Sequence, residues 1–150
     1  MQSLQIGDSL PAMTVTTHDG QQLSLDNLNQ PLVLFFYPKN GTPVCTKEAC
    51  AFRDAYEDFV NAGAVVIGIS SDPAESHRNF ASTHQLPFLL VSDPNQRIRR
   101  AIGVPKTLGL FPGRVTYVID KQGVIRHVFR SQMDAERHVA EAIKILRSLK

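Results

Sequence analysis

Three short apolar runs, separated by helix-like segments, place the strongest constraint on how this chain can fold. Residues 32–37, 65–69 and 88–91 are almost continuous in apolar side chains, as expected of strands buried on both faces of a sheet. Between them lie segments with the apolar spacing of helices, at 43–61 and 72–86. The second of these begins with the arrangement of a capping box. This alternation of strands and helices predicts a sheet that is covered by helices.

The remaining segments complete a mixed sheet with helices on both faces. A short helix is expected at 94–102, a hairpin of two strands at 115–119 and 124–129, and a closing amphipathic helix at 134–149. Short strand-like pieces flank a turn within 13–25. The predicted fold class is therefore α/β, in the order of the thioredoxin fold. In such a sheet, reactive groups belong beyond the carboxyl ends of the strands.

Length and charge limit what the chain can be. Its 150 residues, 43% of them hydrophobic, fit one compact domain that spans 1–150. Sixteen basic and fourteen acidic residues give a net charge of only +2, and no long run of like charge occurs, so nucleic acid is not an expected partner. The N-terminal residues lack a basic region followed by an apolar stretch, and no segment is long enough to cross a membrane. We therefore expect a cytoplasmic protein that does not associate with membranes.

The two cysteines of the chain, Cys45 and Cys50, follow directly after the first buried strand, beyond a turn rich in Pro and Gly. Thr42 has the form of a helix N-cap and Pro43 that of a first helical residue, which places Cys45 in the first turn of a helix. Free backbone N–H groups and the positive end of the helix dipole favour a thiolate there. Cys45 is therefore a candidate nucleophile, and the alternative is an inert buried cysteine.

The spacing of the two cysteines bears on any bond between them. Residues five apart in an intact helix have Cα atoms roughly 8 to 9 Å apart. A disulfide needs Cα atoms within about 7 Å, so a bond between Cys45 and Cys50 would require the start of the helix to unwind. Such a bond would be a catalytic intermediate and not a structural staple. Alternatively, Cys50 faces the core as a small apolar residue.

Other candidate sites receive little support. The five histidines lack metal-ligand spacing and are interpreted as surface or packing residues, and no Gly-rich phosphate loop occurs, so no metal or cofactor is expected. The basic pair Arg99 and Arg100 is interpreted as a solvated helix face. Glu48 lies one turn after Cys45, and it either orients a basic residue or is exposed to solvent.

The spacing of Pro38, Thr42 and Cys45 is the Pro-x3-Thr-x2-Cys pattern of peroxiredoxins. With Thr-Lys-Glu-Ala-Cys following directly, the chain resembles the peroxiredoxin Q group, also called bacterioferritin comigratory proteins. The resemblance extends over nearly the whole chain. It includes the strings at 7–11, 68–72, 90–93 and 114–120.

The resemblance implies a thiol-dependent peroxidase that reduces hydrogen peroxide and organic hydroperoxides. It implies a peroxide pocket formed by Pro38, Thr42, Cys45 and Arg114, in which Cys45 becomes a sulfenic acid. It also implies that Cys50 resolves this acid as an intramolecular disulfide, which thioredoxin reduces. No cofactor is needed, and a monomer is expected.

Alternatives remain for the residues and for the function. Arg114 would otherwise be a solvated strand end, Thr42 a plain N-cap and Pro38 a turn former. A general disulfide oxidoreductase is a second possible function, although a Cys-x2-Cys motif would favour it more than the Cys-x4-Cys found here. A third is a noncatalytic thiol sensor or chaperone, in which oxidation exposes apolar helix surface to a partner.

Overall fold

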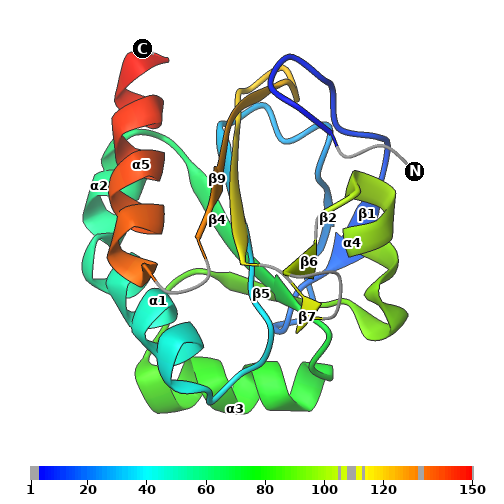
Figure 1. The fold of residues 1–150 in the computed structure, drawn as a ribbon, viewed down its shortest axis with the longest axis vertical. Helices are drawn as coiled ribbons and strands as arrows, with labels where there is room; N and C mark the ends of the chain where they lie inside the picture. The colour runs from blue at the N-terminus through cyan, green and yellow to red at the C-terminus, as the bar shows by residue number, and fades with distance from the viewer. Residues whose placement is uncertain (1–3, 105, 108–110, 113, 132–133, 150) are drawn as a thin grey trace.

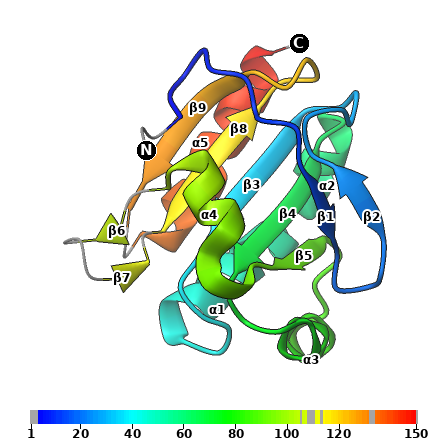
Figure 2. The same cartoon turned by 90° about the vertical axis from the view of Figure 1, so that its right-hand side faces the viewer.

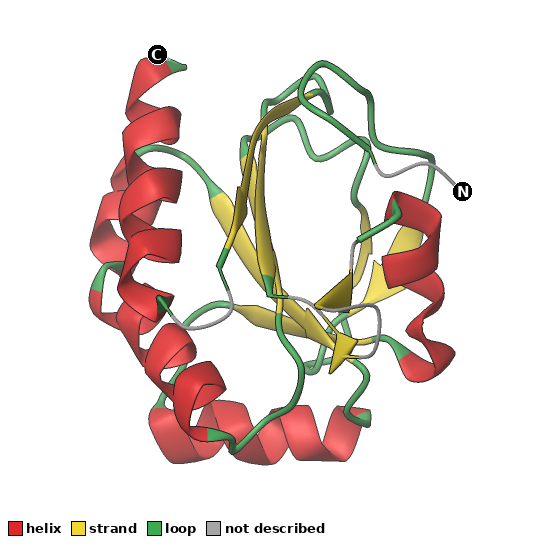
Figure 3. Ribbon diagram, viewed as in Figure 1, coloured by secondary structure: helices red, strands yellow, loops and turns green. Residues whose placement is uncertain are grey.

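A five-stranded mixed sheet lies at the centre of the computed structural model, which describes residues 4–104, 106–107, 111–112, 114–131 and 134–149 (Figures 1 and 3). The strands lie in the order β5 (Leu89–Ser92), β4 (Val65–Ser70), β3 (Leu32–Phe36), β8 (Val115–Ile119) and β9 (Ile125–Arg130). Strands β5, β4 and β3 are parallel, whereas β8 and β9 continue the sheet antiparallel. This is the α/β sheet that the sequence predicts.

Helices cover both faces of this sheet. They are α1 (Pro43–Asp54), α2 (Tyr56–Asn61), α3 (Ala74–His84), α4 (Arg97–Ile102), which follows the 3-10 turn η1 (Pro94–Gln96), and α5 (Ala135–Ser148). Helices α1 and α5 pack together on one face, and α4 lies on the other (Figures 1 and 2). Two small hairpins pair β1 (Thr14–Thr16) with β2 (Gln22–Ser24) and β6 (Lys106–Thr107) with β7 (Phe111–Pro112). Within the described ranges, no helix has the length and apolar character needed to cross a bilayer.

The core consists of two layers, one on each face of the sheet. Because successive side chains of a strand point to opposite faces, Val33 and Phe35 of β3 join the layer under α1 and α5. Leu34 and Phe36 join the layer under α4. All of these side chains are buried, as the continuous apolar run predicts for a central strand.

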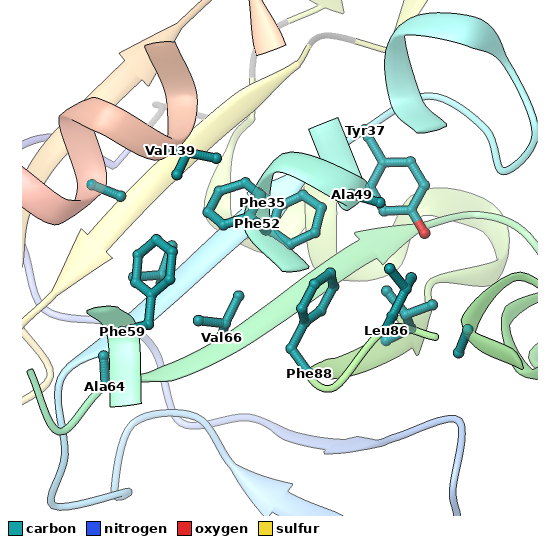
Figure 4. Packing of buried hydrophobic residues seen from close by; sticks show 14 of the residues in the cluster. Phe35, Tyr37, Ala49, Phe52, Phe59, Ala64, Val66, Leu86, Phe88 and Val139 are labelled. Atoms are coloured by element: carbon teal, nitrogen blue, oxygen red, sulfur yellow. The ribbon is translucent and has the colours of Figure 1, made fainter. Parts of the chain in front are cut away.

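A chain of close contacts fixes α1 on the sheet. The ring of Phe35 lies over Gly68 of β4, where a Cβ atom would come within 2.6 Å of the Phe35 Cζ. The same ring stacks on Phe52 of α1, with centroids 4.3 Å apart and planes 13° apart (Figure 4). The absence of a side chain at Gly68 thus makes room for the ring on which α1 packs. This contact sets the position of the helix that carries both cysteines.

The helix expected at 43–61 is in fact two helices. The break lies at Ala55, whose backbone leaves the regular helical conformation with φ −98° and ψ 7°. Neither Gly nor Pro marks this point in the sequence, so the break could not be predicted from local signals. The aromatic rings on both sides of it, Phe52 and Phe59, pack 5.5 Å apart in the same core layer.

Two further expectations are wrong. The capping box before α3 does not form, because Pro73 is the N-cap of the helix. The Asp72 carboxylate instead accepts hydrogen bonds from the Asn40 backbone N–H at 2.8 Å and from Ser70 Oγ at 2.6 Å. Arg99 is not on a solvated face. It is 5% exposed and lies over the Phe36 ring, and burial lowers its pKa to about 10.

Candidate active site

The start of α1 brings Cys45 to the carboxyl end of β3. Thr42 is the N-cap with an extended backbone and Pro43 is the first helical residue, as the sequence predicts. Cys45 lies in the first turn and is only 1% exposed. The Thr42 hydroxyl makes no capping bond to the helix and donates instead to the Lys39 carbonyl oxygen at 2.9 Å.

Asn40 anchors the loop before Cys45 to α3. Its Oδ1 accepts a hydrogen bond from the Tyr37 hydroxyl at 2.6 Å, and its Nδ2 donates to Ser76 Oγ at 3.1 Å and faces His77 Nδ1 at 3.0 Å. Burial lowers the pKa of His77, which favours the neutral ring whose Nδ1 can accept this bond. Together with the bond from the Asn40 backbone to Asp72, these contacts hold the 38–42 segment against the N-terminal part of α3.

Arg114 contacts Cys45 although the two residues are 69 positions apart in the sequence. It lies just before β8 and is 4% exposed, so it is not a solvated strand end. One guanidinium nitrogen donates to Cys45 Sγ at 3.2 Å, and the other terminal nitrogen donates to Glu48 Oε1 at 2.8 Å. Burial acts to lower the Arg114 pKa, but the charges of Glu48 and Cys45 outweigh it and raise the pKa above its ordinary value. A fixed positive charge therefore touches the sulfur.

Glu48 is part of this buried cluster and not an exposed neighbour. Its side chain is fully buried between Arg114 and His138. Burial raises the pKa of Glu48 to about 7, although the Arg114 guanidinium acts to lower it. The carboxyl thus holds the guanidinium in place, and its own charge changes near neutral pH.

His138 of α5 is a member of the cluster that the sequence interpretation missed. Its Nε2 lies 2.7 Å from the Ser131 carbonyl oxygen, which can only accept, so this nitrogen carries the proton. Burial lowers the His138 pKa to about 4, so the ring is neutral and Nδ1 accepts from Thr116 Oγ1 at 2.7 Å. The position of His138 could have indicated its burial, because it lies four residues before Ala142, on the inward face of the closing helix.

Cys50 lies on the same helix in different surroundings. Both cysteines are free thiols, and α1 is continuous across them. Cys50 is partly exposed, and its Sγ lies 3.9 Å from Nδ1 of His84 at the end of α3. The structure therefore brings Cys45, Glu48 and Arg114 together and leaves Cys50 outside that group.

The remaining expected pocket residue, Pro38, lies two residues after the end of β3. Pro38 is partly exposed and lines a cavity of about 10 Å³ with Phe36 and Arg99, a space of roughly one water molecule that Cys45 does not line. The loop at 106–113, a possible outer wall of the pocket, lies outside the described residues apart from the strands β6 and β7. Across the described part of the chain, no cluster of three or more His, Cys, Asp or Glu residues could hold a metal ion.

Comparison with known proteins gives matches over most of the chain. The chain matches the AhpC/TSA family over residues 6–128. It is 48% identical over 146 residues to the chloroplastic peroxiredoxin Q of Sedum lineare, covering 96% of this chain and 78% of the relative. The chloroplastic peroxiredoxin Q of Oryza sativa subsp. japonica is also 48% identical, with 95% of this chain and 67% of the relative covered.

Solved structures give the same result. Peroxidoxin BcpB from Mycobacterium tuberculosis superposes with a TM-score of 0.89 and 34% identity, over 98% of this chain and 99% of that one. The bacterioferritin comigratory protein of Xanthomonas campestris superposes with a TM-score of 0.83 and 28% identity, over 95% and 99% of the two chains. The predicted thioredoxin fold is confirmed by these neighbours.

The expectation of a cytoplasmic protein is wrong, because curated relatives of the chain are named as chloroplast proteins. The resemblance noted in the sequence is confirmed at the level of family and group. The chain belongs to the AhpC/TSA family as a peroxiredoxin of the Q group, and it is a thiol peroxidase that takes a peroxide substrate and a thiol reductant.

Proposed function

We propose that the chain reduces hydrogen peroxide and organic hydroperoxides through the thiolate of Cys45. The observation that carries this proposal is the hydrogen bond from Arg114 to Cys45 Sγ inside a site closed to solvent. A guanidinium fixed beside sulfur stabilises the thiolate, which is the nucleophilic form. The N–H groups of the first turn of α1 act in the same direction.

The oxidation step then needs no cofactor. The thiolate attacks the terminal peroxide oxygen, so that an S–O bond forms as the O–O bond breaks and the leaving oxygen takes a proton to give water or an alcohol. Arg114 and the helix N–H groups stabilise the charge that develops on the leaving oxygen. The Thr42 oxygen can accept the peroxide O–H, since its own proton goes to Lys39, and Pro38 shields the approach. The alkyl peroxide reduction activity of the Xanthomonas campestris relative supports organic hydroperoxides as substrates.

Cys50 is the proposed resolving thiol. It attacks the Cys45 sulfenic acid and closes an intramolecular disulfide. In the continuous α1 helix, the two Cα atoms are about 8 to 9 Å apart by helix geometry, beyond the reach of a disulfide. The first turn of α1 must therefore unwind. The missing side-chain cap at Thr42 favours this opening, because such a cap is worth about 1 kcal/mol to a helix.

Thioredoxin is the proposed reductant of this disulfide. Its dithiol would attack one of the two sulfurs and release the other by exchange through a mixed disulfide. The partial exposure of Cys50 in the folded helix supports access from solvent at this end of the pair. The disulfide would thus be opened by attack at Cys50.

We also propose that the chain acts as a single domain and as a monomer. Among the described residues, the exposed large hydrophobic side chains are Ile6 and Val60, at 61% and 51% exposure. Two such side chains are too few to form the extended apolar patch that is typical of a permanent dimer interface.

Turnover distinguishes the proposal from its alternatives. With thioredoxin, thioredoxin reductase and NADPH, the protein is expected to consume many equivalents of hydrogen peroxide. A noncatalytic sensor would stop after one equivalent. A general disulfide oxidoreductase would reduce insulin disulfides efficiently and would need no peroxide. Either of these results would overturn the proposal.

A further inference from the structure

Helices α1 and α3 lie next to each other in the fold (Figure 1). Cys50 of α1 contacts His84, the last residue of α3. Cys50 Sγ lies 3.9 Å from His84 Nδ1, within the range for a hydrogen bond that involves sulfur. Both side chains are partly buried, so the contact is shielded from solvent but not closed to it. Their sequence separation of 34 residues gives no hint of the contact.

The surroundings hold the His84 ring in place. The ring packs edge-on against Phe80, with centroids 4.8 Å apart. The backbone of the same residue is tied to α1, since an Arg53 guanidinium nitrogen donates to the His84 carbonyl oxygen at 2.8 Å. His84 is also the last residue of α3, so this end of the helix lies against α1. The imidazole is therefore held next to the Cys50 sulfur, where it can accept a proton.

We propose that His84 is the general base for Cys50, an inference that rests on the resolving role proposed above. In the folded helix, the His84 ring takes the proton of the Cys50 thiol and leaves a thiolate beside an imidazolium. The Arg53 guanidinium, one turn along α1, binds the His84 carbonyl oxygen and also interacts electrostatically with Cys50.

The complete resolving step balances without a further reactant. The Cys50 thiolate attacks the sulfur of the Cys45 sulfenic acid, so that an S–S bond forms and the S–O bond breaks. The sulfur of Cys45 is reduced and that of Cys50 is oxidised. The departing hydroxide takes up a proton to leave as water, and the imidazolium gives up its proton, which returns His84 to its neutral state.

A single-turnover experiment tests this role. The reduced protein is mixed with one equivalent of hydrogen peroxide, and sulfenic acid formation and disulfide closure are followed separately by quenching and mass spectrometry. In His84→Gln, oxidation of Cys45 is expected to be unchanged, whereas disulfide closure slows about a hundredfold and is partly restored by added imidazole. The matched control is His127→Gln, in a partly exposed histidine of β9, which should close at the wild-type rate. An unchanged closure rate in His84→Gln would overturn the proposal.

A second measurement separates this inference from the proposed function. In a Cys45→Ser background, the rate of alkylation of Cys50 by iodoacetamide reports its thiolate directly, and His84→Gln should lower that rate. If the wild-type protein forms no Cys45–Cys50 disulfide, the resolving role fails. If alkylation of Cys50 is unaffected by His84→Gln, the role of His84 alone is overturned.

Discussion

Cys45 and Cys50 share one helix but have opposite surroundings. Cys45 is 1% exposed and is held by a buried guanidinium that also pairs with Glu48. Cys50 is partly exposed, and its Sγ lies 3.9 Å from Nδ1 of His84. Charges act more strongly on the buried Cys45 sulfur than on the partly exposed Cys50 sulfur, where solvent screens them in part. This difference supports the proposed division of roles, in which the buried Cys45 attacks the peroxide and the partly exposed Cys50 resolves the sulfenic acid.

The largest loss of activity is expected when the buried thiol of Cys45 is removed. Cys45→Ser should abolish peroxide consumption, because a serine hydroxyl cannot be oxidised to a sulfenic acid. The measurement is the thioredoxin-coupled rate with hydrogen peroxide. Substantial remaining turnover would show that the reaction does not pass through Cys45.

Cys50→Ser tests the resolving role proposed for the partly exposed thiol. The first oxidation should proceed at its normal rate, because Arg114 and the start of α1 are untouched. Sulfenic acid should then accumulate on Cys45, and thioredoxin-linked turnover should be largely lost. Trapping with dimedone and the coupled assay measure these two results. An unchanged coupled rate would mean that the resolving thiol comes from elsewhere.

Arg114→Ala removes the buried cation beside Cys45 and so tests how much this cation contributes to the difference between the two thiols. We expect the second-order rate of Cys45 oxidation to fall about a hundredfold, the usual cost of one fixed donor to a developing charge. The matched control is Arg126→Ala, since Arg126 pairs with Asp120 at 2.6 Å but is half exposed. It should leave the rate unchanged.

Because Arg114→Ala leaves Glu48 buried without its main partner, the double variant Arg114→Ala/Glu48→Gln serves as a second test with less strain on folding. Its oxidation rate should be reduced like that of the single variant. A wild-type rate in a folded double variant would remove Arg114 from the site.

The smallest expected effect is a change in how the free energy of unfolding depends on pH, through Glu48 and His138. The Glu48 pKa is raised from 4.5 to about 7, so between these values the folded protein keeps a proton that the unfolded chain loses, and the free energy of unfolding falls as pH rises. The His138 pKa is lowered from 6.5 to about 4, and this group contributes the opposite slope between those values. Glu48→Gln removes the pH dependence that comes from Glu48 and keeps the one that comes from His138.

Relative to wild type, Glu48→Gln should therefore gain about 3 kcal/mol in free energy of unfolding as the pH rises from 4.5 to 7. Urea unfolding at the two pH values measures this difference. The control Glu141→Gln, in a partly exposed residue of α5, should change with pH as the wild type does. Parallel curves for Glu48→Gln and wild type would contradict the assignment of a proton to Glu48.

Local patterns were sufficient to predict much of the fold and the position of Cys45. The apolar run of β3 and the Thr42-Pro43 helix start are signals within a few residues, and both are found as expected. The pairing of Arg114 with Cys45 spans 69 residues, and only the family resemblance indicated it before the structure was known. Local sequence therefore locates the proposed nucleophile, whereas the fold places the Arg114 guanidinium beside it.

The features that could not be predicted depend on packing between distant elements. Arg99 lies in a polar-looking stretch but is buried against Phe36, and Asp72 binds Asn40 instead of capping α3. His138 and Glu48 meet only because α5 packs on α1. In each case a tertiary contact outweighs the local preference of the residue.

The roles of the two cysteines can be tested by intact mass and non-reducing peptide mapping after one equivalent of hydrogen peroxide. We expect the loss of two hydrogens and a linkage between Cys45 and Cys50, which requires α1 to unwind. A stable added oxygen on Cys45, or a linkage between two chains, would contradict the division of roles between the two cysteines.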